Sequence, residues 1–179
     1  MSDAPAPADP AAPVDLTVRP AAPADLPALV ALHARARATY YPDGVPDDGT
    51  DWTAAWRGAL ERPDGRVLVG VRAGTTVALA SFRPPGDDAA AGTVKLFQFH
   101  VDPGHWRAGI GSALHAACVS RWREAGLRTA VLDVHTGNAR ARAFYAAHGW
   151  TADPARPAWA DDHHLHLRFD VPGGRADGE

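Results

Sequence analysis

The chain has 179 residues, a formal net charge of −3 and a single cysteine, Cys118. One cysteine excludes a disulfide framework and a metal site built from cysteine pairs, and the weakly negative charge argues against a nucleic-acid partner. The chain begins without a basic segment followed by an apolar run. No apolar stretch approaches the ~18 residues that span a membrane, so we expect a cytoplasmic protein with no membrane contact.

The length fits one domain flanked by tails. Residues 1–14 are rich in Ala, Pro and Asp and hold almost nothing to bury, and residues 172–179 are similar. We therefore expect a disordered tail over residues 1–14, a single domain over residues 15–171 and a flexible tail over residues 172–179.

Hydrophobic patterning predicts the elements of the first half of the chain. They are a strand over residues 16–20, helices over residues 24–40 and 51–61, and a hairpin of strands over residues 66–71 and 76–82. Asp25 is the predicted N-cap of the first helix. The hairpin is predicted because its two segments are apolar and β-branched and enclose Ala73-Gly74.

The second half alternates between strands and helices. The strands are predicted over residues 93–101, 129–134 and 163–169, and the helices over residues 109–125 and 138–148. Gly126 and Gly149 follow the two helices, where glycine commonly ends a helix. This alternation, with a hairpin before it, predicts a mixed α/β sheet.

The segment Gly109-Ile110-Gly111-Ser112 begins a predicted helix directly after a strand and a polar loop. The first N–H groups of a helix have no acceptor within the helix and carry partial positive charge, so they bind anions. The two glycines remove Cβ atoms that would keep a phosphate away, and Arg107 adds a cation. The segment predicts a phosphate site, although a plain strand–helix turn with a glycine hinge has the same pattern.

Two other nucleotide-binding motifs fit this segment less well. A Walker loop needs a lysine directly before Ser112, and none is present. A dinucleotide fingerprint needs a third small residue where Leu114 stands. Asp133 has the spacing of a ribose-binding carboxylate but lies inside a predicted strand, so a dinucleotide-binding enzyme stays as the second nucleotide-site alternative.

The stretch FHVDPGHWRAGIGSAL over residues 99–114 resembles the coenzyme A loop of the GCN5-related N-acetyltransferase (GNAT) family. A second block follows at the spacing typical of that family and contains Asn138, Ala141, Phe144, Tyr145 and Gly149-Trp150. The resemblance covers residues 16–169 and is firmest over residues 97–150. It implies an acyl-CoA N-acyltransferase fold, with a mostly antiparallel, twisted central sheet flanked by helices.

The resemblance also implies roles for individual residues. Backbone groups of Phe99, His100 and Val101 would pair with the pantetheine arm of acetyl-CoA like an added strand. The pyrophosphate would be held by the N–H groups of Trp106, Arg107, Ala108, Gly109, Ile110, Gly111 and Ser112. Asn138 would contact the coenzyme near the arm, and Tyr145 would lie near the thioester sulfur as general acid.

Trp106 departs from the pattern of the family, which usually has Gln or Arg three residues before the first glycine. We therefore expect backbone N–H groups, rather than a side chain at this position, to hold the phosphates. For Tyr145, a hydrogen bond to the developing thiolate is favoured over complete proton transfer, because a phenol is a weaker acid than a thiol.

Transfer to an amine requires the neutral amine. An alkylamine with a pKa of about 10.4 is only ~0.04% neutral at pH 7, so a base that titrates near neutrality is useful, and histidine suits that role. His100 and His135 both lie where predicted strands end, and either is a candidate base or an ordinary polar residue. His164 and His166 share a strand face, but two ligands are a weak signal and we expect no metal.

Together these observations predict an N-acetyltransferase that uses acetyl-CoA and acts on a primary amine of a small molecule, protein or peptide. No suitable nucleophile stands out, so the amine would attack the thioester directly. The acidic segment from Asp43 to Asp51 would favour a cationic amine, unless it is an ordinary solvated loop. The protein would be a monomer or homodimer, and a non-catalytic acyl-CoA-binding regulatory module, which would not need Tyr145, stays as the alternative.

Overall fold

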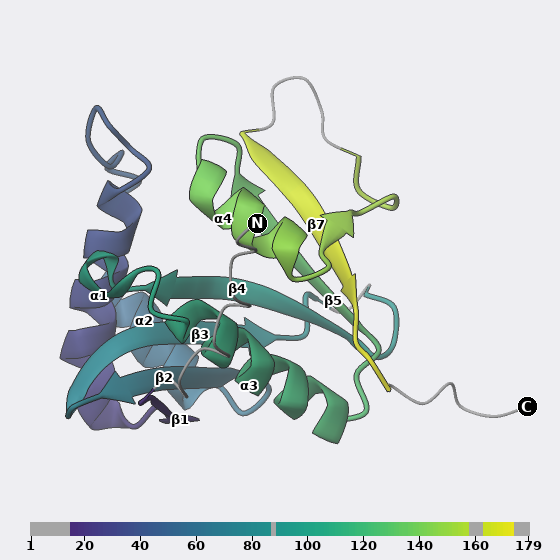
Figure 1. Cartoon of the computed structure of the whole chain (residues 1–179), viewed down its shortest axis with the longest axis horizontal. Helices are drawn as coiled ribbons and strands as arrows, with labels where there is room; N and C mark the ends of the chain where they lie inside the picture. The colour runs from purple at the N-terminus through teal and green to yellow at the C-terminus, as the bar shows by residue number, and fades with distance from the viewer. Residues whose placement is uncertain (1–14, 87–88, 158–162, 174–179) are drawn as a thin grey trace, which may run out of the picture.

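The computed structural model describes residues 15–86, 89–157 and 163–173, so the predicted tail over residues 1–14 and most of that over residues 172–179 lie outside the described residues. The described strands form one seven-stranded sheet in the order β1-β2-β3-β4-β5-β7-β6. They are β1 (Thr17–Pro20), β2 (Arg66–Arg72), β3 (Thr75–Arg83), β4 (Thr93–Val101), β5 (Thr129–His135), β6 (Thr151–Ala152) and β7 (His164–Asp170). Neighbours run antiparallel except β4 and β5 (Figure 1), which confirms the predicted mixed and mostly antiparallel sheet.

Helices cover both faces of the sheet. The α-helices of the described chain are α1 (Leu26–Ala38), α2 (Trp52–Glu61), α3 (Ile110–Glu124) and α4 (Ala139–Ala147), with short 3-10 turns η1 (Pro23–Asp25) and η2 (Pro103–His105). The helices α1 and α2 pack on one face, and α3 and α4 on the other. Within the described ranges, no helix is long and apolar enough to cross a membrane.

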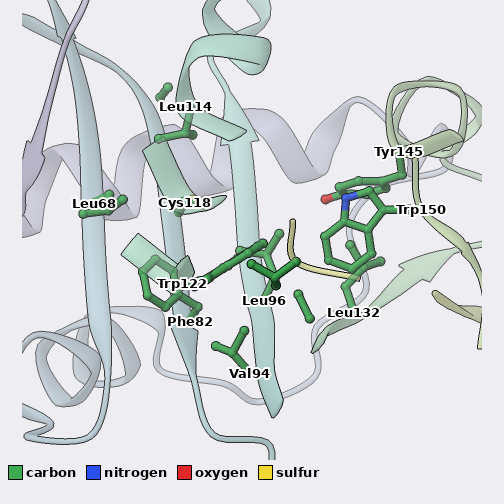
Figure 2. Close-up of a cluster of buried hydrophobic side chains, with 14 of the residues drawn as sticks. Leu68, Phe82, Val94, Leu96, Leu114, Cys118, Trp122, Leu132, Tyr145 and Trp150 are labelled. Carbon is green, nitrogen blue, oxygen red and sulfur yellow. The ribbon is translucent and has the colours of Figure 1, made fainter. Parts of the chain in front are cut away.

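Two hydrophobic clusters hold these layers together, because side chains alternate between the faces along each strand. On one face, Leu32 of α1 and Trp56 of α2 pack with Val69 of β2. On the other face, Trp122 of α3 packs against Phe82 of β3, with ring centroids 5.7 Å apart, in a cluster that also contains Leu68 of β2 (Figure 2). Each fully buried large apolar side chain contributes roughly 1.5–3 kcal/mol, so both clusters stabilise the sheet substantially.

Asp25 is the N-cap residue of α1, as predicted, but its side chain makes no capping hydrogen bond to that helix. The Asp25 carboxylate accepts hydrogen bonds from the Ala22 backbone N–H at 2.7 Å and from the Arg19 guanidinium at 2.8 and 2.9 Å. Asp25 therefore closes the turn η1 in front of α1 and makes no side-chain cap on that helix. The ion pair with Arg19 uses the carboxylate oxygens that would otherwise cap α1, and the local sequence pattern does not reveal this.

The parallel strands β4 and β5 separate halfway along their length. Residues 93–96 of β4 pair with residues 129–132 of β5, and the parallel pairing ends there. Farther along, residues 98–101 of β4 pair with β3, and residues 133–135 of β5 pair with β7. Phe97 is skipped in the register between β3 and β4, which is a β-bulge. A bulge bends its strand, so it accounts for the separation of the two strands at this point.

Candidate functional site

A pocket with a volume of about 240 Å³ lies beside the separated half of β4. Its wall comes from the end of α1, from β4, from the loop and first turn of α3, and from α4. The lining residues are Ala36, Thr39, Tyr40, Phe99, His100, Val101, His105, Trp106, Arg107, Gly109, Ile110, Gly111, Ser112, Asn138, Arg140, Ala141, Phe144 and Tyr145. Of the residues predicted to bind the coenzyme, only Ala108 is missing from this lining. The structure therefore brings two distant sequence blocks together around one pocket.

The first turn of α3 forms one end of this pocket. The first backbone bond of the helix runs from the Ala113 N–H to the Gly109 carbonyl at 3.1 Å, so the N–H groups of residues 110–112 have no acceptor within the helix. The turn before it is tight, with φ of 62° at Arg107 and 74° at Gly109. Free N–H groups, the positive end of the helix and Arg107 together suit a phosphate group.

The two glycines of this turn have different roles. Gly109 adopts a left-handed conformation, φ 74°, which costs a residue with a Cβ about 1–2 kcal/mol. A Cβ on Gly111 would lie 3.1 Å from Cε2 of Phe144. Gly111 therefore makes room for the Phe144 ring. That its missing Cβ also lets a phosphate approach stays a prediction.

Trp106 stands where the family resemblance led us to expect Gln or Arg. Its indole Nε1–H donates to the Val101 carbonyl at 3.0 Å, which ties the loop to the end of β4. The guanidinium carbon of Arg140 lies 3.7 Å from the centroid of the Trp106 ring, and Arg140 also lines the pocket. Arg140 was not among the residues predicted from the sequence, where its position two residues after Asn138 is its one distinguishing feature. It supplies the positive charge that Trp106 lacks.

Asn138 is the N-cap of α4. Its Oδ1 accepts a hydrogen bond from the Ala141 backbone N–H at 3.1 Å. The side-chain NH₂ group of Asn138 keeps its two donors, and Asn138 lines the pocket. The cap fixes the start of the helix that carries Arg140 and Tyr145.

Tyr145 lies in the wall of the pocket with only 7% of its surface exposed. Its ring packs beside Trp150 (Figure 2), with centroids 5.6 Å apart, and its centroid is 6.2 Å from that of Phe99. Burial raises the pKa of the phenol well above its ordinary value of 10.0, and Cys118 and Tyr40 add to this. Tyr145 therefore keeps its proton and is suited to donate a hydrogen bond rather than to transfer the proton completely.

His100 lies in the wall of the pocket as a neutral imidazole. Its Nε2 is 2.9 Å from Oε1 of Gln98, and its ring centroid is 5.1 Å from that of His33. Burial lowers the pKa of His100 to about 3, and His33 and Arg37 contribute. His33 accepts the Trp56 indole N–H at 3.2 Å, and burial lowers its pKa to about 4. His100 is therefore a weak base.

His135 lies at the end of β5, next to the pocket rather than in its lining. Its ring centroid is 5.8 Å from that of Tyr40, which lines the pocket, and 5.1 Å from that of Tyr41. The rings of His163 and His164 lie 6.4 and 5.7 Å away on its other side. Partial burial lowers the pKa of His135, and the charges of His164 and His163 lower it further.

The family model of the acetyltransferase (GNAT) family matches residues 28–150, which is more than half of the chain. The chain belongs to the GNAT acetyltransferase family. No curated protein sequence matches it. The match supports an acetyl-CoA-dependent acetyltransferase, and both blocks of the predicted resemblance lie within the matched residues.

Solved structures of N-acetyltransferases share this GNAT fold. The PaiA N-acetyltransferase of Thermoplasma acidophilum, in complex with coenzyme A, has a TM-score of 0.67 at 15% identity over 87% of this chain and 98% of its own. The ribosomal-protein-alanine N-acetyltransferase of Brucella melitensis has a TM-score of 0.69 at 23% identity over 87% and 99%. The ribosomal-protein-S18-alanine N-acetyltransferase of Escherichia coli has a TM-score of 0.64 at 20% identity over 87% and 94%.

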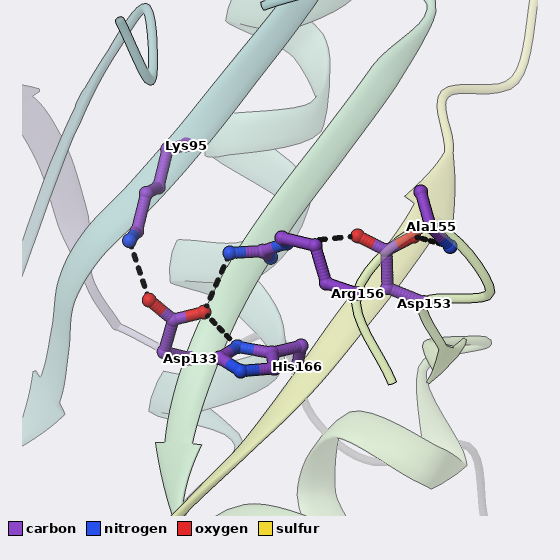
Figure 3. A network of polar contacts seen from close by, with 6 residues as sticks. All are labelled: Lys95, Asp133, Asp153, Ala155, Arg156 and His166. Atoms are coloured by element: carbon purple, nitrogen blue, oxygen red, sulfur yellow. Dashed lines mark hydrogen bonds and ion pairs between the residues drawn. The ribbon is translucent and has the colours of Figure 1, made fainter. Parts of the chain in front are cut away.

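Asp133, which a dinucleotide site would use to bind ribose, lies in an ion network outside the lining of the GNAT pocket (Figure 3). Its carboxylate pairs with the Lys95 ammonium and accepts from Arg156 Nη1 at 2.9 Å and from His166 Nδ1 at 2.7 Å. Arg156 also donates to Asp153 at 3.1 Å. Burial raises the pKa of Asp133, but the hydrogen bonds from Lys95 and His166 outweigh it and lower the pKa to about 2. These contacts argue against the dinucleotide alternative.

Cys118, as predicted, is buried in the core of the GNAT domain. Burial raises the pKa of its thiol to about 12, so it stays protonated and unreactive. Among the residues that the structure describes, no group of three or more His, Cys, Asp and Glu side chains is arranged to hold a metal ion. The pocket lining offers backbone N–H groups, arginines, imidazoles and the Tyr145 hydroxyl.

Proposed function

We propose that residues 15–171 form one N-acetyltransferase domain, which transfers the acetyl group of acetyl-CoA to the primary amine of a small molecule or of a protein or peptide. The observation that carries this proposal is the pocket in which the separated half of β4, the first turn of α3 and Tyr145 meet. The family match, and the coenzyme A bound to the Thermoplasma acidophilum protein, support acetyl-CoA as the co-substrate.

Three parts of the pocket would hold the coenzyme. The N–H groups of residues 110–112, with Arg107 and Arg140, would bind the phosphates, because helix N-termini and guanidinium groups favour anions. Residues 99–101 would pair with the amides of the pantetheine arm, because β4 has left β5 at this point and offers an edge to an added strand. The side-chain NH₂ group of Asn138 would donate to the coenzyme near the arm.

Tyr145 would act on the leaving thiolate. The bound co-substrate supplies the acetyl group as a reactive thioester. As negative charge develops on the departing sulfur, the Tyr145 hydroxyl would donate a hydrogen bond to it. Complete transfer of the phenolic proton is disfavoured, since burial raises the pKa of Tyr145 while an ordinary thiol has a pKa of about 8.5.

Of the two candidate bases, His135 is the better one. Moving a proton from an alkylammonium with a pKa of about 10.4 to an imidazole with a pKa of about 3, as at His100, costs roughly 10 kcal/mol. His135 is only partly buried and retains more basicity. Its lone pair lies on Nδ1, which accepts the Gly137 backbone N–H at 3.0 Å, so it would take the proton of the incoming amine there, directly or through a water molecule, as that bond is released. His100 would shape the pocket as a neutral polar residue.

The amine would attack the thioester directly. A covalent acyl-enzyme requires an activated nucleophile, and the thiol of Cys118 is buried with a raised pKa. The aromatic rings of Tyr40 and Tyr41 lie next to His135, where the amine would enter. This arrangement suits a reaction in which the pocket positions two substrates side by side.

The test is release of free thiol from acetyl-CoA across a panel of amines and peptides. Tyr145→Phe is expected to lower kcat at least ~10-fold while coenzyme A still binds, because only the hydrogen bond to the leaving group is lost. Coenzyme binding without thiol release from the parent protein with any amine would favour the non-catalytic acyl-CoA-binding module. Thermal stabilisation by NAD and not by acetyl-CoA would overturn the proposal in favour of a dinucleotide-binding enzyme.

A further inference from the structure

Ser112, in the first turn of α3, is hydrogen-bonded to a histidine from the far end of α4. Its Oγ lies 3.1 Å from Nε2 of His148. The other ring nitrogen of His148, Nδ1, lies 2.8 Å from the Phe144 carbonyl oxygen. The imidazole of His148 therefore joins the backbone of α4 to a side chain that lines the pocket at its phosphate end.

These contacts fix where the hydrogens of His148 lie. A carbonyl oxygen only accepts, so Nδ1 carries a hydrogen in both the neutral and the charged imidazole. In the neutral ring Nε2 has a lone pair, and the Ser112 hydroxyl donates to it. Ser112 then offers only oxygen lone pairs to the pocket, which is unfavourable beside a phosphate. In the charged ring Nε2–H donates to Ser112 Oγ instead, and the Ser112 hydroxyl is free to donate into the pocket.

We infer that His148 is a proton-linked positioning residue of the phosphate site: when a phosphate group binds, Ser112 turns its hydroxyl toward the phosphate, and His148 takes up a proton from solvent at Nε2. This inference rests on the proposed coenzyme site. Phosphate binding and protonation of His148 then favour each other, because each leaves the Ser112 hydroxyl pointing into the pocket. Because binding takes up a proton, affinity for the coenzyme falls as the pH rises, by up to about tenfold per pH unit.

Other titratable groups near His148 need separate accounts. His115 of α3 has its ring centroid 5.0 Å from that of His148, but its Nε2 lies 3.0 Å from the Trp150 indole nitrogen, which donates to it. Burial lowers the pKa of His115 to about 4, so it stays neutral near pH 7. His105 also lines the pocket, so a variant of His105 serves as a control.

The probe is dephospho-coenzyme A, whose pyrophosphate has no monoester group that titrates near neutral pH. Coenzyme A itself carries a phosphate monoester with a second pKa of about 6, which would release protons on binding and mask the uptake. Isothermal titration calorimetry at one pH in two buffers of different ionisation enthalpy measures the number of protons bound. Repeating the titration from about pH 6 to about pH 8 measures the dependence of affinity on pH.

The variants separate proton uptake from simple packing. His148→Gln keeps a side chain that can hydrogen-bond Ser112 but does not titrate, and Ser112→Ala removes the hydroxyl that links the ring to the pocket. Both are expected to abolish proton uptake and the pH dependence. Ser120→Ala is the matched control, since Ser120 lies on the same helix and donates to Glu124 at 2.9 Å, outside the pocket lining. Ser120→Ala and His105→Gln are expected to retain the uptake.

The expected result is uptake of a fraction of one proton by the parent protein and none by His148→Gln or Ser112→Ala. Binding of dephospho-coenzyme A without proton uptake would overturn the role of His148 and leave the proposed function intact. Uptake that persists in His148→Gln, or disappears in His105→Gln, would overturn it as well. Failure of the parent protein to bind either dephospho-coenzyme A or coenzyme A would overturn both the role of His148 and the proposed function.

Discussion

The guanidinium carbon of Arg140 lies 3.7 Å from the centroid of the Trp106 ring, and both residues line the pocket. The contact ties the loop before α3 to the first turn of α4, while the Trp106 indole N–H ties the same loop to Val101 at 3.0 Å. A cation–π pair contributes about 0.5–1 kcal/mol at an exposed site and more when it loses water. The pair therefore both orders the loop and positions a cation at the phosphate end of the pocket.

Arg140→Ala is expected to weaken coenzyme A binding about tenfold, because a hydrogen bond to a charged group contributes about 1.5–3 kcal/mol and part of this is lost to solvent here. Calorimetric titration with coenzyme A measures the change. Arg142→Ala is the matched control on the same helix, since Arg142 donates to the Thr136 carbonyl at 3.1 Å and lies outside the pocket lining. Equal losses in both variants would mean that only the overall charge matters.

The elements that the sequence predicted well are those with strong local patterns. The strand over residues 93–101 agrees with β4 at both ends, because apolar and β-branched residues run from Thr93 to Val101 between clear turns. The helix predicted over residues 109–125 corresponds to α3, because its local pattern is also clear and a glycine lies at each end. By contrast, β6 has only the two residues Thr151–Ala152, too few to show a period, and it exists through its pairing with β7.

The site was predicted only in part, because some of its contacts depend on packing between distant segments. The stacking of Arg140 on Trp106 requires the loop before α3 to lie against α4, and no local pattern signals that. The contact of Gly111 with Phe144 was missed for a similar reason, since Phe144 is far away in the sequence but adjacent in space. The bond between Ser112 and His148 is a third example, because it joins the start of α3 to the end of α4.

Gly111→Val is expected to displace the Phe144 ring. Phe144 is held on both sides, with ring centroids 5.4 Å from Phe99 and 4.0 Å from His148, so it cannot move freely. Overpacking of this kind costs about 1–3 kcal/mol of unfolding free energy, and coenzyme binding should weaken as well. Denaturation and calorimetry measure the two effects.

The same substitution combined with Phe144→Ala distinguishes the two explanations for Gly111. If the valine collides with Phe144, the double variant loses less unfolding free energy than the two single variants lose together. The difference, which is the coupling energy, should exceed about 0.5 kcal/mol. Strict additivity in stability, with coenzyme binding still weakened in the double variant, would instead favour the explanation that a side chain at position 111 fills the phosphate site.

Asp133→Asn is expected to destabilise the fold without weakening coenzyme binding. The carboxylate meets Lys95, Arg156 and His166, and its loss leaves these groups without their shared anion at a cost of about 1–3 kcal/mol. Because the folded-state pKa of Asp133 is lowered from 3.8 to about 2, its contribution is present above pH 3.8 and is lost as the pH falls through about 2. Weaker coenzyme binding in the folded variant would contradict the position of Asp133 outside the pocket.

The stability of the protein is expected to fall between pH 6.5 and about 4. His33 and His115 are only 2% and 6% exposed, and burial lowers both pKa values from 6.5 to about 4. Between these pH values the unfolded chain binds protons at the two histidines and the folded chain does not. The unfolding free energy is therefore highest above pH 6.5 and falls, as the pH is lowered, by up to about 1.4 kcal/mol per pH unit for each histidine. Urea denaturation across this range measures the slope, which His115→Gln should reduce, and a flat profile would contradict the buried neutral histidines.

The two candidate bases differ in their expected effect on the pH–rate profile. His135 acts as a base only when it is neutral, so its protonation should make kcat/KM fall at acidic pH. Because the pKa of His135 is lowered from 6.5, this acid limb of the pH–rate profile should lie below pH 6.5. His135→Gln is expected to remove this limb and to lower kcat/KM roughly 100-fold, the usual contribution of a general base. His100 stays neutral over the same range because burial lowers its pKa to about 3, so His100→Gln should change the rate without altering the limb. A limb that survives in His135→Gln and disappears in His100→Gln would reverse the assignment.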